Sequence, residues 1–307
     1  MGRASEIELI RTTGRTGAER RALERDVHRG RLRRLRPGVL IGVDALEGLH
    51  PGEQHHVLVR ASLHRLRATD AVSHLSAAAV LALPLVGTPP PKVHVCDPTT
   101  THTRVSAWFV RHGAAGRRPT VLLDRDSIPT TTAARTAVDV AATRPLLESL
   151  AVVDAVLARR TATPTELQTE HGALTSARTK AGIAVGMGSG LSGSPAESVC
   201  RVRFRELGVA EPVQQHVFAR AGGGSAIVDF WFPEHGVVVE VDGRGKYEDP
   251  VMLDGHSTAD AHWREKRRED FVRSFSEVRA VVRLSWSDLM HPDRVRAALR
   301  RAGVPCQ

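Results

Sequence analysis

Cysteine, tyrosine and lysine are scarce in this sequence. Its 307 residues include three cysteines, one tyrosine and four lysines. The cysteines, Cys96, Cys200 and Cys306, are odd in number and far apart, which argues against a disulfide framework and against the closely spaced ligand pairs of a structural zinc site. No apolar run is long enough to span a membrane, and the first residues lack the hydrophobic segment of a signal peptide. We therefore expect a cytoplasmic protein with no membrane partner.

Aromatic residues are also few, and they are unevenly placed. Ten of the twelve lie between Phe204 and Trp286, which predicts that the C-terminal third has a hydrophobic core of its own. The net charge of +9 is uneven too: residues 194–307 hold 17 basic and 17 acidic residues, so the excess lies in the first 193. Residues 1–36 alone contain eleven arginines and five acids, a basic excess of the kind that binds phosphate backbones.

A basic region of winged-helix type is predicted over residues 1–70. Two short helices, over 5–12 and 17–29, are expected before a hairpin from Arg31 to Gly42 that turns at Pro37–Gly38. The candidate nucleic-acid contacts are six arginines of this region and one on a later helix: Arg21, Arg25, Arg29, Arg31, Arg33, Arg34 and Arg267. A solvated basic face explains the six N-terminal arginines equally well, and pairing with neighbouring acids on its helix is the plainer explanation for Arg267.

The middle of the chain, residues 71–185, is predicted to be an α+β region without a convergent nucleophile, base and acid. The expected elements are helices over 71–85 and 146–157, a segment over 127–140 that leads into a helix, and strands over 92–96 and 105–110. His55, His56 and His74 are interpreted as surface or packing residues. Residues 186–193, rich in glycine and serine, are predicted to be a flexible linker. They include a G-x-G-x-x-G pattern, but no strand precedes it, so we expect no nucleotide cofactor.

The stretch from Ser225 to Lys246 carries the candidate chemistry. Two apolar runs, 227–232 and 237–241, flank a Pro-Glu-His-Gly turn, which predicts a β-hairpin with Asp229 opposite Glu240. Because side chains alternate along a strand, one face is expected to be entirely apolar. Its members are Val228, Phe230, Phe232, Val237, Val239 and Val241. The other face is expected to hold Ile227, Asp229, Trp231, Val238, Glu240 and Asp242.

Three carboxylates on one face of an apolar hairpin predict a metal site. Facing carboxylates repel each other, and a half-buried ion needs a partner. A hard divalent cation, Mg²⁺ or Mn²⁺, held by Asp229, Glu240 and Asp242 would supply that partner. The alternative is that these acids form the solvent face of an ordinary surface hairpin.

Residues 194–307 are predicted to follow the order α-β-β-β-α-β-α. With Glu197 in the first helix, Asp229 on the second strand and the Glu240-x-Asp242 pattern on the third, this domain resembles the restriction-endonuclease-like PD-(D/E)xK fold. It is most similar to the branch related to very-short-patch-repair endonucleases. The matching segments are residues 194–198, 228–233, 237–247, 264–270 and 281–289.

The first half of the chain more weakly resembles proteins with an abortive-infection antitoxin-like winged-helix domain, through residues 29–40, 73–85 and 128–141. Together the two resemblances imply an α+β winged-helix-like region followed in the sequence by an α/β nuclease-like domain. The implied activity is metal-dependent hydrolysis of DNA phosphodiesters, in repair or phage defence. The alternative is a non-catalytic DNA-binding regulator of antitoxin type, with a homodimer or a toxin-type protein as its partner.

The nuclease resemblance assigns roles to particular residues. Asp229, Glu240 and Asp242 are the implied metal ligands, and Glu197 either reaches a metal-bound water or only caps its helix with Ser194. The family pattern commonly has a lysine two residues after the glutamate, and here Asp242 occupies that position. Lys246 and Lys266 are therefore the candidates for the catalytic cation.

Overall fold

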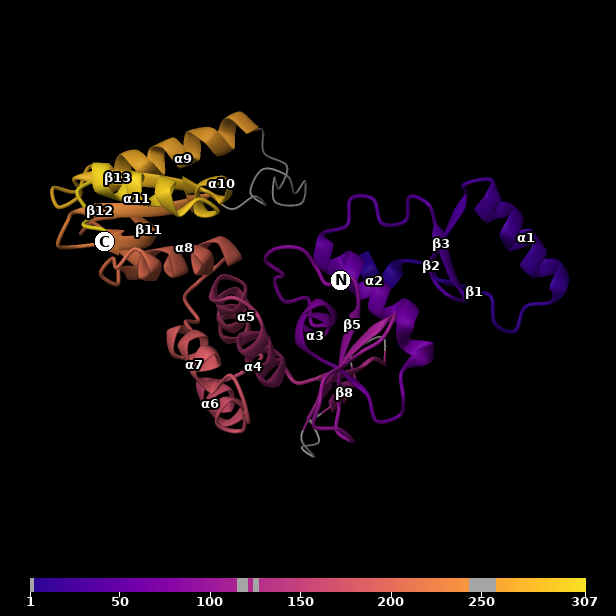
Figure 1. The fold of residues 1–307 in the computed structure, drawn as a ribbon. Helices are drawn as coiled ribbons and strands as arrows, with labels where there is room; N and C mark the ends of the chain where they lie inside the picture. The colour runs from indigo at the N-terminus through magenta and orange to yellow at the C-terminus, as the bar shows by residue number, and fades with distance from the viewer. Residues whose placement is uncertain (1–2, 115–120, 124–126, 243–257) are drawn as a thin grey trace. The chain divides into compact units, whose positions relative to one another are not determined.

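A computed structural model describes residues 3–114, 121–123, 127–242 and 258–307. The chain has a mixed α/β fold and divides into two compact units (Figure 1). Unit 1 comprises residues 1–156 and 161–186, and unit 2 comprises residues 157–160 and 187–307. The regions that the sequence suggested as separate, 1–70 and 71–185, therefore lie within unit 1. No helix of the described residues is long and apolar enough to cross a membrane.

Unit 1 begins with a helix and a three-stranded sheet. The elements are η1 (Arg3–Glu6), β1 (Ile10–Arg11), α1 (Gly17–His28), β2 (Leu32–Arg36) and β3 (Val39–Gly42), with the strands in the order β1-β3-β2. The predicted hairpin and the helix after Thr16 are confirmed. The helix expected over 5–12 is wrong: that segment forms a 3-10 turn and then pairs with β3. A helix of eight residues is marginal alone, and pairing with β3 supplies the backbone bonds instead.

The rest of unit 1 packs helices against a six-stranded mixed sheet. Its elements are α2 (Pro51–Ser62), η2 (Leu63–Arg65), β4 (Ala71–Val72), α3 (His74–Val80), β5 (Val93–Asp97), β6 (Arg104–Val105), β7 (Phe109–Gly113), β8 (Val121–Leu123), β9 (Pro129–Thr131), α4 (Ala133–Thr143), α5 (Leu146–Ala158), α6 (Pro164–Gly172) and α7 (Arg178–Met187). The strand order is β6-β7-β5-β4-β9-β8. The core joins valines of α2, β4 and β5 to Phe109 and Ile128.

Two expectations for this region need correction. The helix predicted over 71–85 is shorter, because Ala71–Val72 pairs with β5 as a strand before α3 begins. The single strand predicted over 105–110 is two strands with a turn between them. In that turn the Ser106 hydroxyl bonds both the backbone N–H and the carbonyl of Phe109, so a local side-chain bond replaces the continuous ladder.

Unit 2 has the predicted order, with one short helix added. Its elements are α8 (Pro195–Glu206), β10 (Val213–Ala219), β11 (Ser225–Phe232), β12 (Val237–Asp242), α9 (Thr258–Arg273), β13 (Ala280–Ser285), α10 (Trp286–Leu289) and α11 (Pro292–Arg301). The sheet order is β10-β11-β12-β13, antiparallel except for the parallel pair β12–β13. Figure 1 shows α8 and α9 on opposite sides of this sheet. Each face of the sheet therefore has its own helical cover.

The hairpin of β11 and β12 has the predicted register where the two strands pair, but the predicted pair of Asp229 and Glu240 is not among the paired positions. Phe230 pairs with Val239, Trp231 with Val238 and Phe232 with Val237. The turn ends at Gly236, which has φ +64° and no room for a side chain, since a Cβ there would lie 2.6 Å from the Glu277 carbonyl oxygen. Glycine is the residue that adopts this conformation without steric cost, so the turn fixes the register.

Candidate active site

The strands of unit 2 part at Asp229. The pairing of β11 with β12 runs only as far as Phe230 and Val239. Beyond that point the Asp229 carboxylate, through Oδ2, accepts a hydrogen bond of 2.7 Å from the backbone N–H of Val241. On the other side of β11, the register with β10 skips the pair of Gln215 and Asp229, and Gln215 has a left-handed backbone with φ +50°. Such a conformation is uncommon for residues other than glycine and marks a local break in the ladder.

This break changes the faces of the hairpin, and the predicted alternation is wrong on one side of it. Phe230 and Phe232 contact Phe204 of α8, with ring centroids 5.2 and 5.3 Å apart. Val228 does not share that face. It packs instead with Trp231, Val238 and Val272, in the cluster under α9. Strict alternation would place Val228 with Phe230, so the alternation of faces breaks at Asp229, although the register of β11 with β10 is the same on both sides of that residue.

Glu197 is a buried carboxylate that three groups hold in place. Its Oε2 accepts hydrogen bonds from the Gly193 backbone N–H (2.9 Å) and from Gln215 Nε2 (3.0 Å). Its Oε1 accepts from the Ser194 hydroxyl, whose oxygen in turn caps the Glu197 N–H. Burial raises the pKa of Glu197, and the negative charge of Asp229 raises it further. Glu197 is therefore both part of a helix cap and an electrostatic neighbour of Asp229.

Glu240 and Asp242 interact with arginines on the α9 side of the sheet. Glu240 is 6% exposed, and its Oε1 lies 3.0 Å from Nη1 of Arg268 on α9. Asp242 is half-buried, with Oδ1 4.0 Å from Nη1 of Arg283 on β13. Arg283 also bonds Glu269 of α9 at 2.9 Å. The carboxylates predicted to share one site thus divide: Glu240 and Asp242 have arginine partners, while Asp229 lies within electrostatic reach of α8.

The predicted catalytic lysines and the predicted metal site are only partly described by the structure. Lys246 lies outside the described residues, and Lys266 is exposed on α9, next to the exposed Arg267. Among residues 3–114, 121–123, 127–242 and 258–307, no group of three or more His, Cys, Asp or Glu side chains converges closely enough to hold a metal ion. The donor chemistry of Asp229, Glu240 and Asp242 nevertheless suits a hard cation, because carboxylate oxygens are its preferred ligands.

The predicted linker contributes contacts to this site. The Ser189 hydroxyl donates to Gln214 Oε1 at 2.9 Å, and the Gly193 N–H donates to Glu197. Gln214 and Gln215, next to each other on β10, thus contact the linker and the buried glutamate respectively. A glycine- and serine-rich composition predicted flexibility, but these backbone and hydroxyl groups make specific contacts with α8 and β10.

The basic residues of unit 1 fall into two groups. Arg34 is paired with Glu24 at 2.5 Å, and Arg31 with Asp26 at 3.4 Å, so both connect the hairpin to α1. The remaining predicted contacts are exposed, and within the described part of the chain their side chains make no hydrogen bond or ion pair: Arg21, Arg25, Arg29 and Arg33. This second group is the better candidate for phosphate contacts.

Sequence reasoning missed a cluster of three histidines in unit 1. His112 Nε2 lies 3.0 Å from His94 Nδ1, and the His112 ring stacks on His74 with centroids 3.6 Å apart. The three rings come from β7, β5 and the start of α3, and only the fold brings them together. Burial lowers the pKa of His112 to about 3 and of His94 to about 4, and it lowers the pKa of His74 well below its ordinary value.

We expect this cluster to make unit 1 sensitive to acid. The unfolded chain binds protons at these rings near pH 6.5, whereas the folded chain resists them down to about pH 4, so stability falls as pH drops through that window. Each such histidine contributes at most about 1.4 kcal/mol per pH unit. In calorimetry between pH 7.5 and 5, the His112→Gln variant should lose less stability than the wild type as the pH falls. His28→Gln, at an exposed position, should match the wild type. If the stability of His112→Gln and of the wild type falls with pH at the same rate, the histidine cluster is not the cause of the acid sensitivity.

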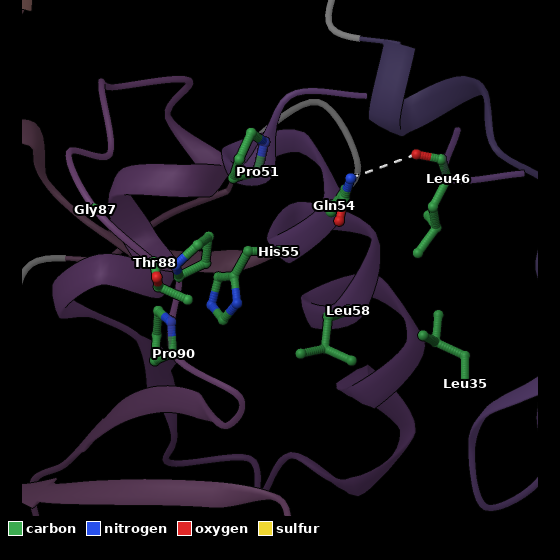
Figure 2. A pocket seen from close by; sticks show the side chains of 10 residues that line it. Leu35, Leu46, Pro51, Gln54, His55, Leu58, Gly87, Thr88 and Pro90 are labelled. Atoms are coloured by element: carbon green, nitrogen blue, oxygen red, sulfur yellow. Dashed lines mark hydrogen bonds between the residues drawn. The ribbon is translucent and has the colours of Figure 1, made fainter. Parts of the chain in front are cut away.

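Unit 1 also contains an open hollow of about 460 Å³ beside α2 (Figure 2). Leu35, Leu58 and the loop of residues 87–90 line it. Two of its polar side chains bond within the protein: Gln54 Nε2 donates to the Leu49 carbonyl at 3.0 Å, and His55 Nε2 bonds the Ser76 hydroxyl at 2.7 Å. Most of the other lining residues are leucines and prolines, so the hollow offers little chemistry and we do not treat it as a candidate site.

Comparison with known proteins adds little to this description. No family model matches the chain. No curated protein matches it either. Among solved structures, the chain is similar to the crystal structure of the RV2827C protein from Mycobacterium tuberculosis, with 17% sequence identity and a TM-score of 0.35. That similarity covers 68% of this chain and 76% of the other. A likeness this weak supports no argument about function, which must come from the residues of the chain itself.

Proposed function

We propose that unit 2 is a restriction-endonuclease-like domain that hydrolyses DNA phosphodiesters with the help of Mg²⁺ or Mn²⁺. The observation that supports this most is the break at Asp229. There a carboxylate leaves the ladder between two strands, with the buried Glu197 on one side and the buried Glu240 on the next strand. Buried acids beside a break in a sheet are costly to fold, and they indicate a site built for chemistry.

In this proposal the residues of the chain have distinct tasks. Asp229, Glu240 and Asp242 would hold the cation, which would polarise the scissile phosphate and lower the pKa of a bound water. Glu197 accepts a proton from the attacking water, a role that its raised pKa favours. Gln215 and Gly193 fix the orientation of Glu197. Lys266 or Lys246 offsets the charge that develops on the phosphate.

Unit 1 is proposed to place the DNA. The exposed arginines of α1 and of the β2–β3 hairpin supply phosphate contacts, which give affinity without sequence specificity. We also propose a cytoplasmic location, which the three free cysteines favour, since disulfides are typical of oxidising compartments. The pathway proposed for this activity is DNA repair or phage defence.

The test is a cleavage assay with purified full-length protein. Supercoiled, linear double-stranded and single-stranded DNA are each incubated with Mg²⁺, with Mn²⁺ and with EDTA. We expect metal-dependent nicking or cleavage of at least one form, and none in EDTA. Absence of cleavage from all three forms in both metals, by protein that binds DNA in the same buffer, would contradict the nuclease function.

A second candidate is a non-catalytic DNA-binding regulator of antitoxin type. It is favoured by the ion pairs of Glu240 with Arg268 and of Asp242 with Arg283, which neutralise two of the three acids without a metal. It would act as a homodimer or with a toxin-type partner. DNA binding that is unaffected by EDTA, together with no cleavage, is the result that would favour it.

A further inference from the structure

Arg268 on α9 is bound to two groups at the edge of the candidate active site. Its Nη1 lies 3.0 Å from Glu240 Oε1 and donates a hydrogen bond of 2.7 Å to the Ile227 carbonyl on β11. The arginine side chain is 30% exposed and the glutamate side chain 8%. A single guanidinium thus connects a buried carboxylate of β12 to the backbone of the strand that carries Asp229.

This contact supplies the charge that a buried glutamate needs. Removing a carboxylate from water without a positive partner costs several kcal/mol, so Glu240 requires a cation of some kind in the folded state. The guanidinium provides it, and it also satisfies a backbone oxygen at the same time. A metal ion at Glu240 would provide the same charge to the same carboxylate. The guanidinium and a metal ion would therefore bind the same carboxylate, that of Glu240.

We propose that Arg268 competes with the divalent cation for Glu240 and thereby sets the metal affinity of this domain. The inference rests on the proposed nuclease function. The metal binds only when the guanidinium releases the carboxylate. Metal binding at Glu240 is therefore an exchange of one cation for another. Arg268 stabilises the metal-free protein and weakens its binding of metal. Cleavage then requires a metal concentration high enough to displace the arginine.

The competition predicts opposite effects of one substitution. Arg268→Gln removes the competing charge, so we expect Mn²⁺ to bind at least fivefold more tightly than to the wild type. The same change leaves Glu240 without its arginine, so the metal-free variant should melt at a lower temperature and should regain more stability on adding Mn²⁺. A residue with only a structural role would lower the melting temperature without tightening metal binding.

The experiment measures Mn²⁺ binding by electron paramagnetic resonance of the free ion, with melting curves of the same full-length samples. Arg279→Gln is the matched control, because it removes the same charge from an exposed position of unit 2. Its Mn²⁺ affinity should stay within twofold of the wild type. Arg268→Lys, which keeps the charge but not the forked geometry, should bind with an intermediate affinity. It also replaces Arg268→Gln if that variant does not fold.

The possible outcomes separate the inference from the function on which it rests. Equal Mn²⁺ affinities of Arg268→Gln and Arg279→Gln would overturn the competition and leave the nuclease proposal standing. Tighter binding that persists in the double variant with Glu240→Gln would place the metal elsewhere and overturn the inference as well. Failure of the wild type and Arg268→Gln alike to bind Mn²⁺, with no cleavage, would overturn both.

Discussion

Replacement of Asp229 by asparagine is expected to abolish metal-dependent cleavage and to leave the stability of the metal-free protein nearly unchanged. The carboxylate of Asp229 has two tasks that this substitution separates. It is a proposed metal ligand, and its Oδ2 accepts the N–H of Val241 at the break between β11 and β12. Asparagine keeps an oxygen that can accept this hydrogen bond but loses the negative charge that a hard cation requires.

The response to Mg²⁺ should distinguish the two proteins most clearly. A ligand that binds only the native state stabilises it by about 2.7 kcal/mol when its concentration is one hundred times the dissociation constant. We expect Mg²⁺ to raise the melting temperature of the wild type and to do so much less for Asp229→Asn. Melting curves at matched ionic strength, with and without Mg²⁺, are the measurement.

Two further variants make the result specific. Asp229→Ala removes the acceptor as well as the charge, so it should lose about 1–3 kcal/mol of stability even without metal, because the Val241 N–H is left unsatisfied. Glu234→Gln removes a carboxylate from the exposed turn of the same hairpin and should behave like the wild type in every assay. If Mg²⁺ stabilises the wild type and Asp229→Asn equally, and neither nicks DNA, the regulator is the better account of this protein.

The parts of unit 2 that the sequence predicted are those that depend on short-range patterns. The hairpin register follows from two apolar runs and a turn that ends at Gly236, and the observed pairing of Trp231 with Val238 has this register. The start of α8 follows from Ser194 as its cap and Pro195 as its first residue. In each case the signal lies within a few residues of the structure that it determines.

The parts that it did not predict depend on contacts between distant segments. The break in alternation at Asp229 lies opposite the left-handed backbone of Gln215 on the neighbouring strand. The pairing of Glu240 with Arg268 joins two elements that are far apart in the sequence, so carboxylates that alternate correctly along β12 still do not reveal their partners. The histidine cluster of unit 1 has the same origin, since its rings come from three separate elements. Alternation along a strand predicts which face a residue lies on, but the segments packed against that face determine what the residue contacts.

Removal of three arginines from unit 1 should weaken DNA binding and flatten its dependence on salt. The triple variant replaces Arg21 and Arg25 of α1 and Arg33 of β2 with alanine. These side chains are exposed and, among the described residues, make no ion pair, so their removal breaks no contact that stabilises the fold. Alanine also has a high helix propensity, so α1 should persist. Each lost phosphate contact lowers the slope of log K against log salt by about 0.9.

Three contacts together amount to a slope change of nearly three, so a fourfold rise in salt should weaken the wild type about 40-fold more than the triple variant. Fluorescence anisotropy with a labelled duplex, between 50 and 200 mM salt, is sensitive enough to measure this difference. The matched control replaces Arg104, Arg178 and Arg301 with alanine, which removes the same charge from exposed positions outside α1 and β2. An effect of net charge alone would flatten the salt dependence of both triple variants alike. A flatter slope in the Arg21, Arg25 and Arg33 variant alone would therefore place the phosphate contacts on α1 and its hairpin. Equal slopes in all three proteins would show that this surface is only solvated and that any DNA contacts lie elsewhere on the chain.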